Sequence, residues 1–438
     1  MNHIENIASL AELDNFLDAQ IEQNRKGDFE VLFLDQLGEL SNVSKISVEQ
    51  TDHDFTFGIC PNGHISMTNA LACGVSNEAE LYWKLIGELF NATTLWFGWR
   101  VLEPLEGQWT YKKEVNGYGP MENMIKRAKE LNHKITAHAV LYPRNDVSPD
   151  FLHHCTPEEA LKFLERHTKK LVEAYKDDID FWHPVNEAYA GIQEVGALKV
   201  NEGLVYKWVR DVDPSAQLVD NGGYTIHPEF YEKGIKNAHL YGADVDYLGI
   251  RGYFEYYNAE SLLFYKKLWN HFDHLTSLYG KKIKFTEIGA CSKNPSRSYD
   301  ECMTDDPTVD MGLGLAKTDA AVDAMMTEET QAIFLEKMYK LMFAHSNVYE
   351  CSYWDLLDNY TWNQVDGGLV RKDFSPKPAY RKLQELIHKT WHTKEEVEVI
   401  DGVLRFRGFY GIYKLNINGK EYSVSLTKGN NKAVIALV

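Results

Sequence analysis

The chain has 438 residues, enough for two or three average domains or for one large barrel with an additional unit. Hydrophobic residues make up 44% of it and charged residues 25%, as in an ordinary globular protein. Its net charge of −18, without a basic run, disfavours nucleic-acid binding. No apolar stretch approaches the roughly 20 residues of a membrane span. We therefore expect neither a nucleic acid nor a membrane as partner.

The first residues and the cysteines bear on the compartment of the protein. Residues 1–20 lack the apolar region and the small-residue cleavage site of a signal peptide. As written, the sequence predicts a cytoplasmic protein, or a secreted or periplasmic one if a leader has been removed. Six scattered cysteines without a CxxC spacing predict neither a disulfide framework nor a zinc site.

Both ends of the chain are rich in predicted strands. A helix over 10–25 precedes strands at 29–34 and 45–49, and five more strands are expected at 396–400, 403–408, 411–417, 421–426 and 432–437. Asp401-Gly402 and Asn418-Gly419 are two-residue hairpin signals. Because two or three strands cannot cover an apolar face alone, the two ends are expected to pair into one small β-sandwich. Its role is structural in our interpretation, and glycan binding is the alternative.

The middle of the chain alternates strands with helices, which is typical of parallel βα units. The expected strands are 55–60, 93–97, 134–141, 181–185, 216–219, 247–252, 283–288 and 349–356, and the expected helices include 78–90, 157–176, 260–279 and 328–345. Thr156 and Glu159 form a capping box at the start of one of these helices. Eight such units predict an α/β fold, a (β/α)8 TIM barrel, with its active site at the carboxyl ends of the strands.

These assignments divide the chain into three parts. Residues 1–54 hold the N-terminal helix and the first strands of the accessory β-sandwich. Residues 55–392 form the catalytic barrel, and residues 393–438 complete the β-sandwich.

Two of the predicted barrel strands end in a glutamate. The strand at 181–185 is followed by Glu187, and the strand at 283–288 contains Glu287. One such glutamate alone also fits a helix cap or a surface ion pair. Two of them, on the fourth and seventh strands of the ring, can converge on one sugar. Glycosidic cleavage needs such a pair, one group to protonate the leaving oxygen and one to attack or support the reacting carbon.

Several short motifs occur in a fixed order along the chain. They are Phe90-Asn91, Glu103-Pro104, Gly107, His138, Asn186-Glu187-Ala188, Thr286-Glu287, and a segment from Tyr353 to Tyr380 with Trp354, Trp362, Gly367-Gly368-Leu369 and Pro376-Lys377-Pro378-Ala379-Tyr380. In these motifs, from about residue 57 to residue 387, the chain resembles glycoside hydrolase family 10, the (β/α)8 endo-β-1,4-xylanase family.

The resemblance implies a role for each matched residue. It makes Glu187 the acid/base and Glu287 the nucleophile of a retaining double displacement. Asn186 would then hydrogen-bond the sugar 2-hydroxyl, and His138 would bind another hydroxyl of the same sugar. Trp354 and Trp362 would form walls of the cleft, although either ring also fits a core role.

Other positions depart from the family pattern. The polar residues that usually bind the non-reducing side of the substrate on the second strand are missing. Arg100 is the candidate replacement for the lysine of that set, and Trp99 is a further candidate substrate-binding residue. Tyr142 stands where a Trp is expected. Arg251 and Tyr253 replace a Gln and a His near the nucleophile, where Arg251 would favour the ionised carboxylate and Tyr253 would donate a hydrogen bond to it. Recognition of the glycan is therefore expected to be altered.

A long loop follows the seventh strand. It runs over residues 290–327, far beyond the roughly 15 residues after which loops in compact domains are usually functional or disordered. Because it leaves the barrel directly after Glu287, we expect it to narrow the site toward short or decorated oligosaccharides.

The sequence thus predicts a retaining glycoside hydrolase of the endo-1,4-β-xylanase type, acting on xylan-like polysaccharide or xylo-oligosaccharide without a metal or organic cofactor. Two alternatives stay open. The first is a β-glycosidase for another or a decorated β-linked glycan, and the second is a catalytically silent carbohydrate-binding protein. The oligomeric state is not predicted.

Overall fold

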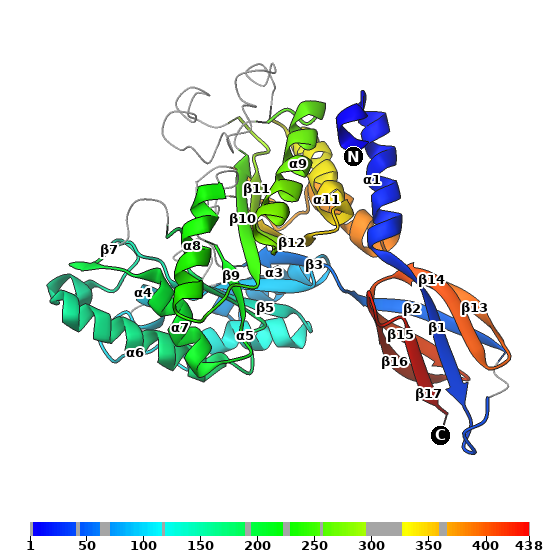
Figure 1. The fold of residues 1–438 in the computed structure, drawn as a ribbon, viewed down its shortest axis with the longest axis horizontal. Helices are drawn as coiled ribbons and strands as arrows, with labels where there is room; N and C mark the ends of the chain where they lie inside the picture. The colour runs from blue at the N-terminus through cyan, green and yellow to red at the C-terminus, as the bar shows by residue number, and fades with distance from the viewer. Residues whose placement is uncertain are drawn as a thin grey trace.

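The computed structural model describes residues 3–40, 44–61, 71–115, 119–188, 194–221, 228–254, 257–294, 326–358 and 366–437. Within these ranges, eight parallel strands close into a barrel, and strands from both ends of the chain form a second sheet beside it (Figure 1). The predicted fold class, a (β/α)8 barrel with an accessory unit built from the two ends, is confirmed. The loop over residues 290–327 falls largely outside the described residues, and Trp362 lies outside them entirely.

The barrel strands follow one another in chain order around the ring, and the last pairs with the first. Most of their residues are buried, because helices cover the outside and side chains fill the inside. The strands are β3 (Thr56–Cys60), β4 (Ala92–Trp96), β5 (Lys134–Leu141), β6 (Phe181–Val185), β9 (Gln217–Asp220), β10 (Tyr247–Phe254), β11 (Lys282–Ala290) and β12 (Val348–Trp354). Between β6 and β9, the chain forms the short ribbon of β7 (Glu194–Val195) and β8 (Leu198–Lys199).

Helices connect the barrel strands. Serine or threonine caps begin several of them, and the capping box of Thr156 and Glu159 is present at the start of α6. The helices are α3 (Asn77–Gly87), α4 (Trp99–Leu102), α5 (Met121–Glu130), α6 (Pro157–Tyr175), α7 (Glu202–Val212), α8 (Pro228–Leu240), α9 (Leu262–Tyr279), α11 (Glu328–Ala344) and α12 (Pro378–Glu385), with the short η1 (His3–Asn6), η2 (Asp150–His154) and η4 (Leu386–Thr390). Of the helices in the described ranges, none has the length and hydropathy needed to cross a bilayer.

The accessory sheet has the strand order β16-β15-β2-β13-β14-β1-β17 within the described residues. Its strands are β1 (Lys26–Leu34), β2 (Lys45–His53), β13 (Lys394–Ile400), β14 (Val403–Phe409), β15 (Gly411–Ile417), β16 (Lys420–Leu426) and β17 (Lys432–Ala436). The two ends of the chain therefore pair as predicted. Hydrogen bonds join the strands into one continuous sheet, which curves around a single apolar core that includes Val31, Phe406 and Leu415.

Two hairpins of this sheet have the turn chemistry that the sequence indicates. Asp401 and Gly402 have φ angles of 50° and 72°, and Asn418 and Gly419 have φ angles of 53° and 84°. Positive φ at both central residues defines the type I′ turn, whose twist matches that of the flanking strands. The Asp-Gly and Asn-Gly pairs therefore fix the register of β13 with β14 and of β15 with β16.

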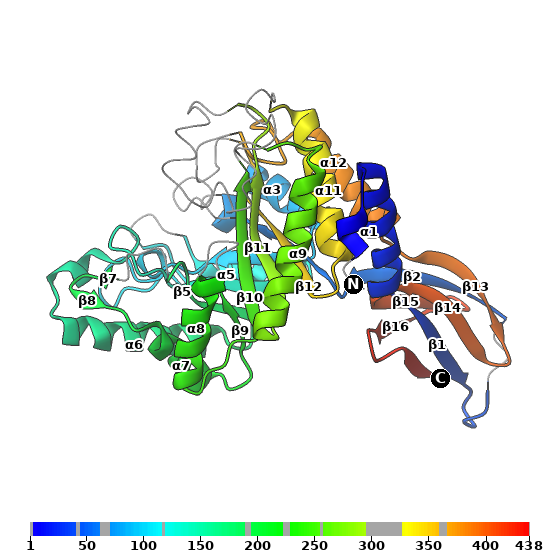
Figure 2. The same ribbon diagram turned by 45° about the horizontal axis from the view of Figure 1, so that its top comes forward.

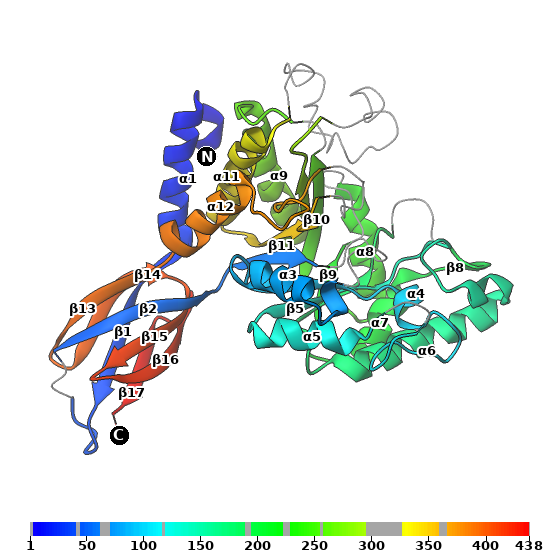
Figure 3. The ribbon, with the colours of Figure 1, turned by 180° about the vertical axis from the view of Figure 1, so that it is seen from behind.

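The N-terminal helix α1 (Leu10–Asn24) stands beside α11 of the barrel, as Figures 1, 2 and 3 show. Its buried residues Leu13, Leu17 and Ile21 belong to the apolar core of the barrel. Lys337 on α11 also contacts Asp14. The helix thus packs on the barrel, although the sequence analysis groups it with the accessory strands.

A buried ion pair inside the barrel predicts a stability effect. Lys284 Nζ lies 2.6 Å from Glu350 Oε2, both side chains are 1% exposed, and the Ser352 hydroxyl donates to Glu350 Oε1 at 2.6 Å. Lys284→Met leaves the Glu350 carboxylate buried without its cation, and we expect a loss of about 3–5 kcal/mol in the free energy of unfolding. Chemical denaturation measures this loss. Lys284→Met combined with Glu350→Gln should lose clearly less, and equal losses in both variants would contradict the role of the pair.

Candidate active site

Glu187 and Glu287 lie at the carboxyl-terminal rim of the barrel. Glu187 follows β6 by two residues, and Glu287 lies near the end of β11. The side chain of Glu187 is 14% exposed and that of Glu287 is 5% exposed. The strand topology therefore brings to one rim two carboxyl groups that are far apart in the sequence.

Two donors hold the oxygens of Glu187. The Tyr142 hydroxyl donates to Oε2, and Arg251 Nη1 donates to Oε1. Arg144 supports Tyr142, because its Nη1 donates to the Tyr142 hydroxyl at 3.1 Å and its guanidinium lies over the ring. Arg251 was predicted to favour the ionised form of Glu287, and its charge does lower the pKa of Glu287. Its hydrogen bond to Glu187 was not predicted.

The backbone of Glu187 is held as well. Its φ of 51° is left-handed, a conformation that costs a non-glycine residue roughly 1–3 kcal/mol. Its N–H donates to the Asn221 carbonyl at 3.1 Å. The surrounding structure thus fixes both ends of this residue.

Glu287 is more deeply buried and has its own set of partners. The Tyr253 hydroxyl donates to Oε2, and Asn221 Nδ2 donates to Oε1 at 3.1 Å. Burial raises the pKa of Glu287. The charge of Arg251 and the hydrogen bonds from Tyr253 and Asn221 lower this pKa, whereas the charge of Glu187 raises it. The balance leaves the pKa of Glu287 above the usual glutamate value.

Asn221 contacts both glutamates, and it is not among the residues predicted for the site. It follows β9 and is fully buried. Its Nδ2 also donates to Asn186 Oδ1 at 2.8 Å, and its Oδ1 accepts from the Thr286 hydroxyl at 2.7 Å. Gly249 leaves room for it, since a Cβ there would lie 2.4 Å from Asn221 Oδ1. The signal was available, because Asn221 ends an apolar strand just as Glu187 does.

His138 faces Glu287 from β5. Its Nε2 lies 3.7 Å from Glu287 Oε1, and its Nδ1 lies 2.7 Å from Nδ1 of His183. Burial lowers the pKa of His138 to about 3, so the ring is neutral. One of the two Nδ1 atoms must donate to the other. We assign this proton to His183, because His138 then carries its own proton on Nε2, facing the carboxylate.

Aromatic rings surround these polar groups. Trp96 from the end of β4 packs on His138 and Tyr142, with ring centroids 5.3 Å and 6.1 Å apart. Trp354 from the end of β12 meets His138 edge to face at 5.0 Å. Trp96 was not among the predicted site residues, whereas Trp354 was, and both rings pack on His138.

Two predicted binding residues lie elsewhere. Trp99 is 1% exposed, stacks on His167 at 4.6 Å, and donates to Glu103 at 3.0 Å. It is therefore a core residue, because an indole that is this deeply buried has no face left for a ligand. Arg100 forms an ion pair with Asp150 at 3.0 Å. The structure does not place either residue in contact with the two glutamates.

A protein-family model matches most of the chain. Residues 67–386 match the model of glycosyl hydrolase family 10. The chain belongs to glycosyl hydrolase family 10. The motifs around Glu187 and Glu287 predicted this family.

Two curated proteins are similar in sequence to this chain. Endo-1,4-beta-xylanase B of Thermotoga neapolitana is 22% identical over 340 residues, which are 71% of this chain and 85% of that protein. The anti-sigma-I factor RsgI6 of Acetivibrio thermocellus is 21% identical over 425 residues, 94% of this chain but 48% of the factor. This chain therefore spans about half the length of that relative.

Solved structures agree with the fold. Xylanase 10B from Thermotoga petrophila, in complex with xylobiose, has a TM-score of 0.55 at 20% identity, over 77% of this chain and 95% of that one. Xylanase 10C from Cellvibrio japonicus has a TM-score of 0.57 at 18% identity, over 76% of this chain and 70% of that one. At these identities the similarity supports the barrel fold.

Proposed function

We propose that the protein cleaves β-1,4-linked xylan or xylo-oligosaccharides with retention of configuration. Glu287 acts as nucleophile and Glu187 as acid/base. The observation that supports this proposal is that both carboxyl groups lie at the same rim of the barrel, where Arg251 donates to Glu187 and its charge also acts on Glu287. We also propose residues 55–392 as the catalytic unit, with the accessory sheet in a structural role.

The first step forms a covalent intermediate. A Glu287 oxygen attacks the anomeric carbon while the bond to the leaving oxygen breaks, and Glu187 gives its proton to that oxygen. Both oxygens of Glu187 accept hydrogen bonds, from Tyr142 and Arg251. The Glu187 oxygen that carries the proton therefore turns from one of these donors to the glycosidic oxygen, which accepts that proton. The remaining donor then keeps the carboxyl group aimed at the scissile bond.

The second step releases the sugar. Glu187, now ionised, takes a proton from a water molecule, and the water oxygen attacks the anomeric carbon as the ester to Glu287 breaks. Asn221 and Tyr253 stabilise the returning carboxylate by the hydrogen bonds that they already donate to Glu287. In this proposal Asn186, whose Oδ1 accepts a hydrogen bond from Asn221, binds the sugar 2-hydroxyl.

A panel of substrates tests this function. Wild-type protein is assayed on aryl β-xyloside, aryl β-glucoside, xylan and other β-linked polysaccharides, with Glu287→Ala as the control for contaminating activity. Release of xylo-oligosaccharides from xylan by the wild type alone supports the proposal. Glycan binding without turnover of any substrate would contradict it, and would favour a binding protein.

A second candidate is a β-glycosidase for another or a decorated glycan. The β4 side of the site favours this candidate. The family's polar residues are missing there: the Trp96 indole lies at the end of β4, and the next residue, Phe97, is fully buried. Arg251 also brings a guanidinium beside both glutamates, a group suited to an acidic substituent. Faster cleavage of glucuronate-decorated oligosaccharides than of plain ones would support this candidate.

The acidity of Glu287 predicts a pH effect. The Tyr253 hydrogen bond lowers the pKa of Glu287, so Tyr253→Phe should raise that pKa further. Because the nucleophile must be ionised, the acid limb of the kcat/KM profile should move to higher pH. Tyr142→Phe is the matched control, since its hydroxyl contacts Glu187, and it should leave the acid limb in place. An acid limb that stays or moves to lower pH in Tyr253→Phe would contradict the assignment.

A further inference from the structure

A pocket lies at the opposite end of the barrel from Glu187 and Glu287. It has a volume of about 380 Å³, within the usual range for small-ligand sites. The amino ends of strands β3, β5, β6, β10, β11 and β12 contribute to its wall, and the turn between β16 and β17 closes one side. Both the barrel and the accessory sheet therefore take part in it.

The lining of this pocket is positively charged. Lys134, Lys282, Lys284 and Lys428 line it, together with the Asp54 carboxylate. Lys284 is paired with the buried Glu350, which leaves three lysines against one carboxylate in the described lining. In a chain with a net charge of −18, such a concentration of cations favours an anionic ligand.

Aromatic rings form the other part of the wall. Phe181, Tyr247 and Tyr349 line the pocket, and Lys282 Nζ lies 4.4 Å from the centroid of the Tyr349 ring and 5.9 Å from that of Tyr247. Burial raises the pKa of Tyr247 to about 12, so its hydroxyl keeps its proton and can donate a hydrogen bond. Flat rings beside cations suit a ligand with both a ring and a negative charge.

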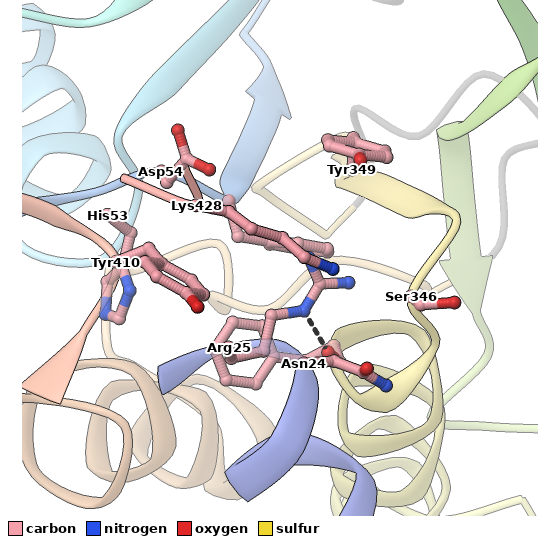
Figure 4. Close-up of a pocket in the computed structure, with 10 residues that line it drawn as sticks. Asn24, Arg25, His53, Asp54, Ser346, Tyr349, Tyr410 and Lys428 are labelled. Atoms are coloured by element: carbon pink, nitrogen blue, oxygen red, sulfur yellow. Dashed lines mark hydrogen bonds between the residues drawn. The ribbon is translucent and has the colours of Figure 1, made fainter. Parts of the chain in front are cut away.

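Lys428 reaches this region from the accessory sheet. A smaller neighbouring pocket shares Asp54, Tyr349 and Lys428 with the pocket at the amino ends of the strands. Figure 4 shows this neighbouring pocket, into which Lys428 and Arg25 are directed. Arg25 is buried and donates to the backbone carbonyls of Phe343, His345 and Val348. Its guanidinium adds a further fixed positive charge next to Lys428.

We propose that the pocket at the amino ends of the barrel strands binds a small anionic sugar, a uronic acid or a sugar phosphate. The anion lies among Lys134, Lys282 and Lys428, and the sugar ring packs on Tyr247 and Tyr349. Because Lys428 belongs to the accessory sheet, the ligand links the sheet to the barrel and stabilises their contact. This site is separate from the glutamates and does not depend on their function.

Calorimetric titration of the full chain tests the proposal. The probes are glucuronate and glucose 6-phosphate, with glucose as the neutral counterpart and inorganic phosphate as the anion without a ring. Wild-type protein should bind at least one of the two anionic sugars, and should bind it more tightly than glucose or phosphate. A preference between glucuronate and glucose 6-phosphate identifies the source of the charge. Bound ligand should also raise the Tm.

Two double variants locate the binding. Lys282→Gln with Lys428→Gln removes two exposed cations of the pocket and should weaken binding by about tenfold or more. Lys281→Gln with Lys420→Gln changes the net charge equally outside the pocket and should leave binding unchanged. Hydrolysis of an aryl β-glycoside should be the same in both variants. Failure of both anionic sugars to bind at millimolar concentration, equal binding of glucose, or equal losses in the two double variants would overturn the proposal.

Discussion

Glu287→Ala is expected to lower kcat on an aryl β-xyloside by at least about a thousandfold, because the ester to the sugar cannot form. Tyr253 and Asn221 lose only the carboxylate that they contact, and the other groups that face the sugar stay in place. KM should therefore change far less than kcat. Steady-state kinetics on the purified variant measures both quantities.

A small anion distinguishes a missing nucleophile from a misfolded site. Azide or formate fits the space of the deleted carboxylate and attacks the anomeric carbon from the same face. It should restore turnover in Glu287→Ala and give a product of inverted configuration. The control is Glu202→Ala, which removes another buried carboxylate. Glu202 lies on α7 and accepts a hydrogen bond from Asn237 on α8 at 2.6 Å. Near-normal kcat in Glu287→Ala would refute the role of Glu287.

Glu187→Ala is expected to reduce activity to an extent that depends on the leaving group. General acid catalysis contributes roughly a hundredfold to ten-thousandfold to a rate. A sugar or alkyl alcohol leaves poorly without a proton, so cleavage of xylan should fall by this full factor. A dinitrophenolate leaves readily without protonation, and its release in the first step should be slowed much less. Pre-steady-state kinetics on the two kinds of substrate measures the difference.

The configuration of the azide product distinguishes Glu187→Ala from Glu287→Ala. In Glu187→Ala, azide should replace water in the second step and give a product of retained configuration, opposite to the result for Glu287→Ala. Tyr142→Phe removes only one donor to Glu187 and should cost much less than deletion of the carboxyl group. If Glu187→Ala slows both leaving groups equally, the assignment of the acid to this residue fails.

Much of the barrel could be predicted from the sequence because its signals are local. The runs at 134–141 and 181–185 coincide with β5 and β6, since a strand covered on both faces is a continuous apolar segment. The two glutamates were visible for the same reason, as acidic residues at the ends of such segments. The capping box at Thr156 and the two glycine hairpin turns were equally local.

The contacts within the site could not be predicted, because they depend on how strands meet. The sequence places Arg251 on the strand next to Glu287, but only the barrel geometry directs its guanidinium to Glu187. Trp99 and Trp96 look alike in the sequence, yet one stacks on a helix and the other faces His138. The packing of α1 on α11 likewise depends on a contact between segments more than 300 residues apart.

The most direct test is to trap the covalent intermediate. A xyloside with a good leaving group and fluorine in place of the 2-hydroxyl slows breakdown of the glycosyl-enzyme, so the ester accumulates. Wild-type protein is incubated with this reagent and digested, and mass spectrometry locates the added sugar. The account predicts one sugar per chain, attached to Glu287. Attachment at Glu187 or at any other residue would contradict it, as would turnover of the reagent without a labelled peptide.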